Sequence, residues 1–210
     1  MRGEDVPTKQ VIEAYDLVRK FRAAHQVPLV TANNGLRSMV RSEGCAIEVS
    51  QRLKRLPTIL DKLQREPRLP LSSMQDIGGV RAVLGSVDEV RRVEARLTKR
   101  REPVGYADYI SSPRASGYRG VHVIVAYQGR QIEVQLRTRV MHDWAITVER
   151  LSSRMGENLK GDGQHALQEL MAVISSAMAI EEGGGTVDAD LLLRISELRE
   201  VAAPYLSGGR

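Results

Sequence analysis

Two β-rich runs separated by three residues constrain the fold of this chain more than any other feature. The runs are Tyr118–Tyr127 and Gln131–Arg139. Their connection, Gln128–Arg130, is short and contains a glycine, which is typical of a β-hairpin. A third run, Asp76–Leu84, is rich in valine, isoleucine and glycine and indicates a buried strand. We therefore expect a fold that is built on a β-sheet.

Helices and further strands surround these runs. The adjacent glycines Gly78 and Gly79 indicate close backbone approach in the third run, and Gly183–Gly185 indicates a flexible joint. Further strands are predicted at 46–51 and 102–110, and helices at 8–25, 32–44, 56–65, 87–101, 140–156, 162–181 and 188–202. The fold class is α+β, with a mixed, mostly antiparallel sheet of about five strands flanked by helices. We expect N-terminal helices at 1–45, a core at 46–157 and C-terminal helices at 158–210.

Composition narrows the class of partner and the compartment. The chain has 210 residues and is 42% hydrophobic, which is enough for one sizeable core. Its net charge of +5 favours anionic partners such as nucleotides, phosphates or RNA, although a basic surface is often merely solvated. The single cysteine, Cys45, excludes an internal disulfide and suits a reducing cytosol. Because MRGEDVPTK has no apolar core and the apolar stretch Met171–Ile180 is short, we expect no signal peptide, no membrane span and a cytoplasmic location.

Two acidic residues on predicted strands, Asp76 and Glu133, indicate a site for a divalent cation. Mg²⁺ is usually bound by one or two carboxylates together with phosphate oxygens of the substrate. The alternative is a pair of strand-edge acids that form surface salt bridges.

A polar face follows the second strand of the predicted hairpin. Glu133, Gln135 and Arg137 alternate with apolar residues and therefore share one face. On the neighbouring strand Tyr118 and His122 point the same way, and Tyr118 offers a ring on which a base could stack. Tyrosine and histidine on a strand are more often core or rim residues, so a plain exposed sheet face is the alternative.

Basic residues cluster before the third run. Arg52 and Lys54 share a face of one predicted strand, and Lys62 and Arg65 share a face of the helix that follows. They could form one wall of a triphosphate site, or a solvated basic surface. The sequence has no Walker motif, dinucleotide-binding glycine pattern, Cys/His metal cluster or hydrolase nucleophile elbow.

Five motifs in a fixed order resemble the RelA/SpoT synthetase domain. They are RLK from Arg52, DIGGVR from Asp76, DYISSPRASGYRGVH from Asp108, IEVQLRT from Ile132 and WAITVE from Trp144. The resemblance runs from 52 to 149, nearly half of the chain. The chain is expected to be a stand-alone small alarmone synthetase or a toxin relative, with no hydrolase domain before it and no regulatory domain after it.

The resemblance implies a nucleotidyltransferase-like sheet and an activity. The β,γ-pyrophosphate of ATP would be transferred to the 3′-hydroxyl of GDP or GTP, which gives (p)ppGpp. Asp76 and Glu133 would bind Mg²⁺, and Glu133 would also orient or deprotonate the 3′-hydroxyl. The implied ATP-side residues are Arg52 against adenine and Lys54, Lys62, Arg65 and Arg81 against phosphates. The implied acceptor-side residues are Tyr118, stacked on the base, and Arg114, Ser116, His122, Gln135 and Arg137. The resemblance also implies a homo-oligomer, such as a tetramer.

Three departures from the family pattern leave the acceptor open. Members that use guanine nucleotides usually carry Lys and Asn where this chain has Arg114 and Ser116, and a histidine where it has Arg150. Arginine keeps the charge of lysine with another geometry, and serine has a shorter reach than asparagine. Besides the guanine nucleotide reaction, two alternatives remain. One is a toxin, held by an antitoxin, that modifies the tRNA 3′ end or makes adenosine alarmones. The other is a degenerate domain that binds nucleotides or RNA.

Overall fold

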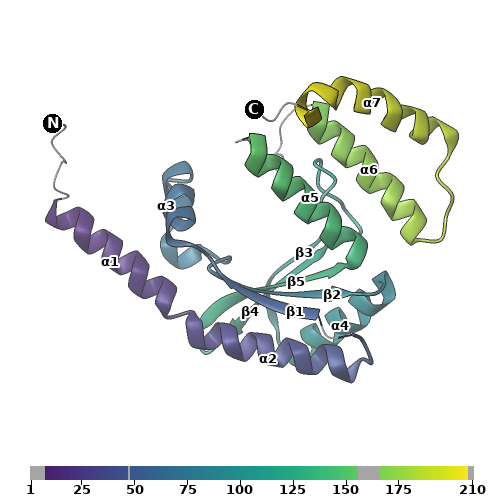
Figure 1. Cartoon of the computed structure of the whole chain (residues 1–210). Helices are drawn as coiled ribbons and strands as arrows, with labels where there is room; N and C mark the ends of the chain where they lie inside the picture. The colour runs from purple at the N-terminus through teal and green to yellow at the C-terminus, as the bar shows by residue number, and fades with distance from the viewer. Residues whose placement is uncertain (1–7, 47, 156–165, 208–210) are drawn as a thin grey trace, which may run out of the picture.

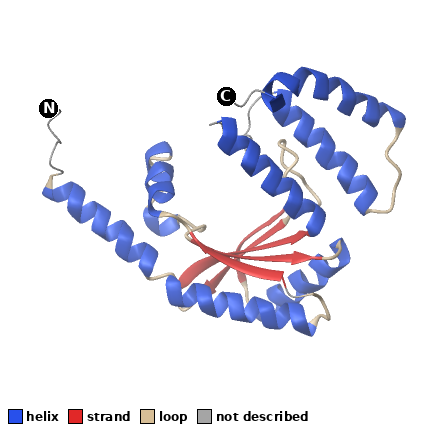
Figure 2. Ribbon diagram, in the orientation of Figure 1, coloured by secondary structure: helices blue, strands red, loops and turns tan. Residues whose placement is uncertain are grey.

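The computed structural model describes residues 8–46, 48–155 and 166–207, and its centre is a five-stranded sheet with the order β1-β2-β5-β4-β3 (Figures 1 and 2). The strands are β1 Glu48–Leu53, β2 Gly78–Leu84, β3 Pro103–Asp108, β4 Val121–Tyr127 and β5 Arg130–Thr138. Strands β2 and β5 run parallel, whereas the β1–β2, β4–β5 and β3–β4 pairs are antiparallel. The expected α+β class and mostly antiparallel sheet are confirmed.

Helices cover the two faces of the sheet differently. The helices are α1 Lys9–Ala23, α2 Gln26–Ser42, α3 Leu56–Arg65, α4 Val87–Arg100, α5 Arg139–Met155, α6 Ala166–Glu182 and α7 Ala189–Ser207. Helices α2 and α4 lie against one face, and α5 lies over part of the opposite face, with α6 and α7 stacked outside it (Figure 1). Part of the second face is therefore left open beside α5.

Alternation along the strands separates an apolar face from a polar one. Val80 and Ala82 of β2 and Val134 and Leu136 of β5 are buried in one core cluster with residues of α2 and α4. Because successive strand residues point to opposite faces, the side chains between them point to the open face. The apolar run that predicts these strands thus also places their polar residues at one surface.

Two smaller core clusters attach the remaining helices. One joins α5, α6 and α7 and contains Tyr118 and Trp144. The other joins α1 and α3 and contains Val18 and Ile59. Among the helices of the described ranges, none is long and apolar enough to cross a membrane.

Several predicted boundaries are wrong for local reasons. Helix α2 begins at Gln26 instead of 32, because Pro28 falls in its first turn, where a missing N–H group costs no helical hydrogen bond. Strand β2 begins at Gly78, so Asp76 precedes it, and β4 begins at Val121, so Tyr118 lies in the loop before it. The predicted helix start at 162 lies outside the described residues.

Close packing onto the strand backbone occurs at one of the two adjacent glycines. A Cβ on Gly78 would lie 2.7 Å from Cδ1 at the end of the Ile132 side chain, so a larger residue would require that side chain to shift. A Cβ on Gly79 would meet its neighbours only at ordinary contact distance, from 3.8 Å. The absence of a side chain at Gly79 instead leaves the floor of a pocket open, as described below.

Candidate active site

The open face of the sheet carries two adjoining pockets. The arginine pocket, of about 250 Å³, is lined mainly by Arg52, Lys54, Gly79, Arg81, Gln135 and Glu149. The tyrosine pocket, of about 520 Å³, is lined mainly by Lys62, Tyr106, Tyr109, Arg114 and His122. Asp76 and Glu133 line both pockets. Two carboxylates therefore stand on the wall between two separate cavities.

The strand register explains the shape of the arginine pocket. Arg52 of β1 pairs with Gly79 of β2, and Gly79 pairs with Glu133 of β5. Gly79 has no side chain, so the floor between the guanidinium of Arg52 and the carboxylate of Glu133 stays open. The sequence places a glycine where a ligand can approach the sheet backbone.

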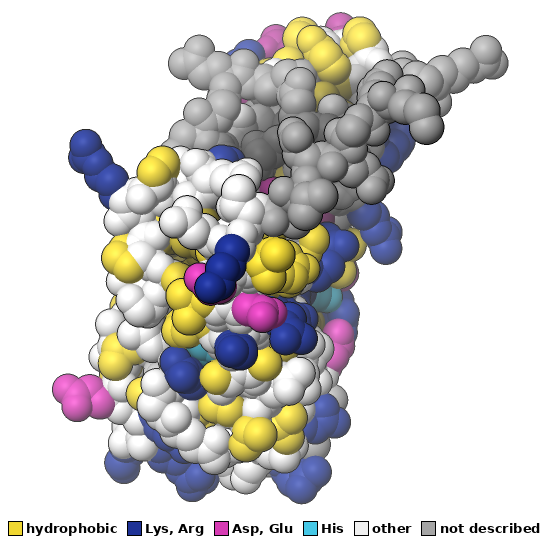
Figure 3. Space-filling model, turned by 90° about the vertical axis from the view of Figure 1, so that its left-hand side faces the viewer, with side chains coloured by type: hydrophobic (Ala, Val, Ile, Leu, Met, Phe, Trp, Pro, Cys, Tyr) yellow, Lys and Arg dark blue, Asp and Glu magenta, His cyan; other side chains and the backbone are white. Residues whose placement is uncertain are grey.

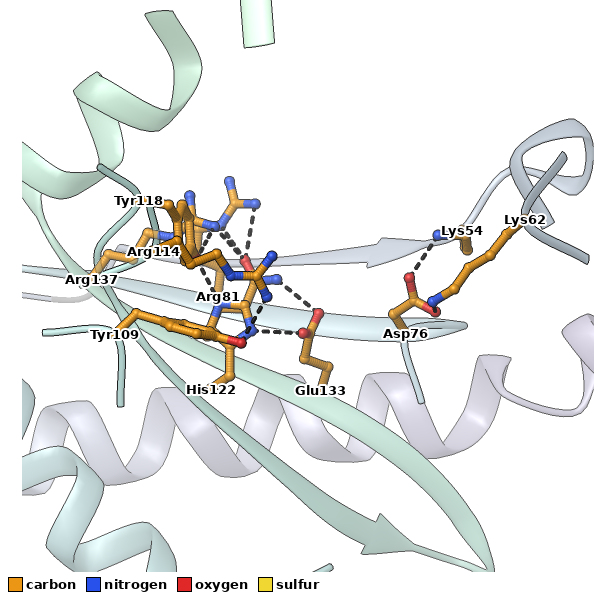
Figure 4. Close-up of polar contacts among 11 residues, drawn as sticks. Lys54, Lys62, Asp76, Arg81, Tyr109, Arg114, Tyr118, His122, Glu133 and Arg137 are labelled. Atoms are coloured by element: carbon orange, nitrogen blue, oxygen red, sulfur yellow. Dashed lines mark hydrogen bonds and ion pairs between the residues drawn. The ribbon is translucent and has the colours of Figure 1, made fainter. Parts of the chain in front are cut away.

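Asp76 is held by two lysines. Lys54 Nζ donates to Asp76 Oδ2 at 2.7 Å, and Lys62 Nζ donates to Oδ1 at 3.2 Å (Figure 4). Burial raises the pKa of Asp76, but the hydrogen bond from Lys54 and the charges of both lysines outweigh it. The pKa therefore lies below the ordinary value. Asp76 is a carboxylate at neutral pH.

Glu133 ends a chain of hydrogen bonds across the site (Figure 4). Arg137 Nη2 donates to the Tyr118 hydroxyl at 2.7 Å, which lies 2.5 Å from His122 Nε2. His122 Nδ1 lies 2.9 Å from Glu133 Oε1. A carboxylate only accepts, so Nδ1 carries a proton. Because the Tyr118 hydroxyl already accepts from Arg137, its own proton is donated to His122 Nε2, which is the acceptor nitrogen of the ring.

Hydrogen bonds within the site keep Glu133 ionised. Burial raises its pKa, but hydrogen bonds from His122 and from Gln135, whose Nε2 donates to Oε2 at 2.7 Å, outweigh it. The pKa of Glu133 therefore lies below its ordinary value. A polar group positioned above Glu133 would meet a carboxylate whose orientation is already fixed.

Two guanidinium groups share one neutral acceptor beside the arginine pocket. Arg81 donates through Nε and Nη2 to Gln135 Oε1 at 3.3 Å, and Arg137 Nη2 donates to the same oxygen at 2.9 Å. Within the described ranges neither forms a salt bridge with a carboxylate. Burial and the nearby charge of Arg137 lower the pKa of Arg81. The charge of Glu149 raises the pKa of Arg81 and offsets this only in part, so the two buried guanidinium groups favour an anion in the pocket.

The loop 109–120, between β3 and β4, forms the far side of the tyrosine pocket. The Arg114 guanidinium lies 4.4 Å from the centroid of the Tyr109 ring and donates through Nη2 to the Tyr109 hydroxyl at 2.7 Å. The rings of Tyr118 and His122 stand edge-on to Tyr109 at 5.6 and 5.3 Å. Tyr109 and His122 of this cluster thus line the cavity together with Arg114, whereas Tyr118 does not.

The structure brings most of the predicted site residues together, but some of them line the other pocket from the one that was predicted. Lys62 lines the tyrosine pocket instead of the arginine pocket, and Gln135 lines the arginine pocket. Arg65 is exposed on α3 and lines neither pocket. Ser116, which is 1% exposed, and Arg137, which is 4% exposed, are buried and line neither pocket. Their predicted contacts with an acceptor stay predictions.

Tyr118 is placed differently from the sequence expectation. Its ring is only 6% exposed and packs near Trp144, so it offers no open face for stacking here. The expected alignment of Tyr118 with His122 is correct, although a loop and not a strand produces it. Its role in stacking stays a prediction.

Sequence reasoning gave no role to Tyr109 or Glu149, although both lie in the motifs that it used. Tyr109 follows Asp108 in the long third motif, and Glu149 ends the last one. Glu149, on α5, lines the arginine pocket together with Arg52 and also borders a basic hollow that contains Arg150. Their place within those motifs was the only signal in the sequence.

The donor set at the shared wall fits Mg²⁺. Carboxylate oxygens are hard ligands, and Mg²⁺ takes one or two of them plus phosphate oxygens. Among the described residues, no group of three or more His, Cys, Asp or Glu could hold a metal by itself. A cation at Asp76 and Glu133 would therefore depend on a nucleotide for the rest of its ligands.

The lowered pKa of Asp76 predicts a pH-dependent contribution to stability. Because the pKa is lower in the folded state, the contribution is present above the unfolded value, about 4, and is lost as pH falls through the folded pKa. We expect Asp76→Asn to lower the free energy of unfolding by about 1–2 kcal/mol at pH 7, and the difference from wild type to shrink in strong acid. Urea unfolding of wild type and variant at pH 7 and in strong acid measures the difference in the free energy of unfolding. Asp61→Asn, at an exposed position of α3, is the control, and an equal effect at both pH values would contradict the prediction.

The comparison with protein families decides how this site is classified. The sequence pattern of the family described as the region found in RelA / SpoT proteins matches residues 51–151. The chain contains a RelA/SpoT domain. This RelA/SpoT domain includes the end of β1, all of β2 to β5 and most of α5, and so includes both carboxylates of the shared wall.

Named relatives and solved structures agree with the RelA/SpoT assignment. GTP pyrophosphokinase YjbM from Bacillus subtilis is 32% identical over 53% of this chain and 58% of its own length. An uncharacterized protein from Mycobacterium tuberculosis is 33% identical over 62% of this chain and 52% of its own length. The chain thus spans little more than half the length of these relatives. The crystal structure of small alarmone synthetase 1 from Bacillus subtilis, bound to its product pppGpp, is similar over 88% of this chain and 99% of that one, with 25% identity and a TM-score of 0.64.

Proposed function

We propose that this protein transfers the β,γ-pyrophosphate of ATP to the 3′-hydroxyl of a guanine nucleotide and so makes (p)ppGpp. The observation that carries the proposal is the position of Asp76 and Glu133, which line both pockets. A transfer between two nucleotides needs the donor phosphate and the acceptor hydroxyl to meet at one point. The two named relatives in Bacillus subtilis, a GTP pyrophosphokinase and a synthetase that binds pppGpp, support the substrate class.

ATP is assigned to the arginine pocket. Arg52 offers a planar guanidinium for the adenine ring, and Arg81 and Lys54 offer charge for the phosphates. The two guanidinium groups that share Gln135 form no salt bridge with a carboxylate within the described residues, and the charge of Glu149 offsets theirs only in part, which favours a polyanion there. Figure 3, viewed from the side of α1 and α3, shows many Lys and Arg side chains and fewer acidic ones, which suits anionic substrates.

The acceptor nucleotide is assigned to the tyrosine pocket. Tyr109 and Arg114 provide a ring and a guanidinium for the base, and His122 and Glu133 form the wall toward the donor. With this assignment, the acceptor hydroxyl would lie next to the donor phosphate at the shared wall. The acceptor side of the proposal thus rests on Tyr109 as well as on the residues that the sequence indicated.

Glu133 orients the attacking hydroxyl. It accepts the hydroxyl hydrogen bond and takes the proton as the bond from the 3′-oxygen to the β-phosphorus forms. The bond between the β-phosphorus and the oxygen that bridges to the α-phosphate breaks, and AMP leaves. Because the pKa of Glu133 lies below its ordinary value, it is a weak base. A loose phosphoryl-type transition state needs positioning and charge neutralisation more than early proton removal.

Mg²⁺ would be held by Asp76 and Glu133 together with phosphate oxygens, and would neutralise phosphate charge. Lys54 and Lys62 hold the Asp76 carboxylate in place beside the donor pocket. The protein groups thus supply binding, orientation and a fixed carboxylate wall.

We also propose partners beyond the substrates. Apolar side chains on α1 and α7 are exposed, among them Ile12, Leu17, Leu193 and Val201. Such faces suit a homo-oligomer, for which a tetramer stays a prediction, or an antitoxin. A cytoplasmic location is likewise a prediction.

One labelling experiment tests the proposed function. The purified chain is incubated with γ-labelled ATP and Mg²⁺, in parallel with GDP, GTP, AMP, ADP and deacylated tRNA. We expect the label in a guanosine product, together with AMP release. Label on an adenine nucleotide or on tRNA alone would overturn the guanine assignment, and label nowhere with ATP still bound would indicate a degenerate domain. Omission of Mg²⁺, or its removal with a chelator, is expected to stop transfer.

A further inference from the structure

The acceptor-side loop is supported by a helix that lies outside the matched family region. Loop 109–120 contains Arg114 and Tyr118, and its own backbone bonds are few. Tyr109 N donates to Gly120 O, Arg114 N to Tyr118 O and Gly117 N to Arg114 O. These bonds close the loop on itself. Its links to the sheet are the bond from Ser112 N to Asp108 O at the end of β3 and the Tyr118 hydroxyl, which contacts His122 and Arg137. Helix α6, which begins fifteen residues after the matched region ends at 151, adds two further attachments.

One attachment is made at the backbone of Gly117. Ser175 Oγ donates to the carbonyl oxygen of Gly117 at 2.6 Å, and Ser175 is only 5% exposed. Gly117 has φ +86°, and a Cβ there would lie 2.7 Å from Ala172 Cα. The loop backbone is thus in direct contact with the backbone of α6, at a distance that only glycine permits.

The other attachment is a buried ion pair. Arg119 Nη1 lies 3.0 Å from Glu182 Oε2, and the two side chains are 9% and 8% exposed. Tyr118, between Gly117 and Arg119, belongs to the core cluster of α5, α6 and α7. Trp144 of α5 also donates through Nε1 to Met171 O of α6 at 2.8 Å, which fixes the helix beside the loop.

We propose that Ser175 and Glu182 are positioning residues for the acceptor nucleotide. Ser175 holds the loop backbone before Tyr118, and Glu182 holds the side chain of Arg119 after it. Through this part of the loop they set the place of Arg114, Tyr109 and His122. Neither residue lines the arginine or the tyrosine pocket. The inference rests on the proposed function for its substrate, whereas the attachment itself can be tested without any activity.

The kinetic test separates the two substrates. Initial rates of the full chain are measured with varied GDP or GTP at saturating ATP, and with varied ATP at saturating acceptor. We expect Ser175→Ala and Glu182→Gln each to raise the acceptor KM on the order of tenfold or more, because small displacements of positioning groups carry large rate penalties. The KM for ATP is expected to stay unchanged, since Ser175 and Glu182 contact Gly117 and Arg119, neither of which lines the arginine pocket.

Matched controls lie next to both residues. Ser176→Ala removes a hydroxyl that donates to Ala172 O within its own helix, and Glu181→Gln removes an exposed charge. Both should behave as wild type. The double variant Arg119→Met/Glu182→Leu replaces the ion pair by an apolar one, which buried sites often tolerate, and should recover acceptor KM relative to Glu182→Gln. Equal rises in both KM values, or no rise in either, would overturn the proposal.

Hydrogen exchange tests the attachment independently of activity. Amides of residues 114–120 should exchange faster in Ser175→Ala and Glu182→Gln than in wild type, while those of β4 and β5 should not change. If wild type transfers label to no acceptor but the loop still loosens, the proposed function fails and the attachment stands. If the loop exchange is unchanged in both variants, the attachment fails whatever the activity is.

Discussion

Glu133→Gln is expected to reduce transfer by about 10²–10⁴-fold while leaving the fold intact. Glutamine has the same shape but cannot take the proton of the acceptor hydroxyl, and it removes one negative charge from the wall between the pockets. It also turns the acceptor of the His122 Nδ1 hydrogen bond into an amide, which still offers one oxygen. ATP binding should change little, because Arg52, Arg81 and Lys54 remain.

The measurement is the single-turnover rate of label transfer, with ATP binding followed separately by calorimetry. Glu102→Gln, at an exposed position before β3, is the matched control and should keep wild-type rates. Near-normal transfer by Glu133→Gln would remove Glu133 from the mechanism. Loss of ATP binding equal to the loss of rate would reassign it to the donor pocket.

Gly117→Ala is expected to lower the free energy of unfolding by about 2 kcal/mol or more. Two costs add at this position. The residue has φ +86°, a left-handed conformation that a side chain disfavours, and the new methyl group would lie 2.7 Å from Ala172 Cα and 3.0 Å from Ser175 Cβ. Either the loop or α6 has to shift.

Gly129→Ala is the control that separates these two costs. Gly129, in the β4–β5 hairpin, has φ +74°, but a Cβ there would meet nothing within 4 Å. Gly129→Ala should lower the free energy of unfolding only by the cost of the left-handed backbone conformation, about 1 kcal/mol. Urea unfolding of both variants gives the comparison. Equal losses would show that α6 yields freely at Gly117, which would contradict the close contact described above.

The sheet and the carboxylate pair were predictable because their signals are local. Strict alternation in β5 places Glu133 and Gln135 on one face, and the hairpin brings His122 beside them, as the register confirms. The two glycines of β2 predicted close approach, which holds at Gly78. A short strand that carries its chemistry on every second residue leaves little freedom in placing it.

The parts that were not predictable depend on contacts between distant segments. The burial of Tyr118 follows from the packing of α6 and Trp144, which no local pattern encodes. Arg65 lies one turn beyond Lys62 on α3, and only the tertiary placement of that helix decides that Lys62 reaches Asp76. The position of Asp76 before β2, instead of within it, depends on where pairing with β1 begins.

The two pockets rest on different structural elements, and this affects how each of them can change during evolution. The arginine pocket is built mainly on β1, β2 and β5, whose backbones are paired on both sides or packed on the core. The tyrosine pocket depends in part on one loop, and that loop rests on α6 through Ser175 and Glu182. Substitutions on a peripheral helix can therefore alter acceptor preference over generations while the donor half is inherited unchanged.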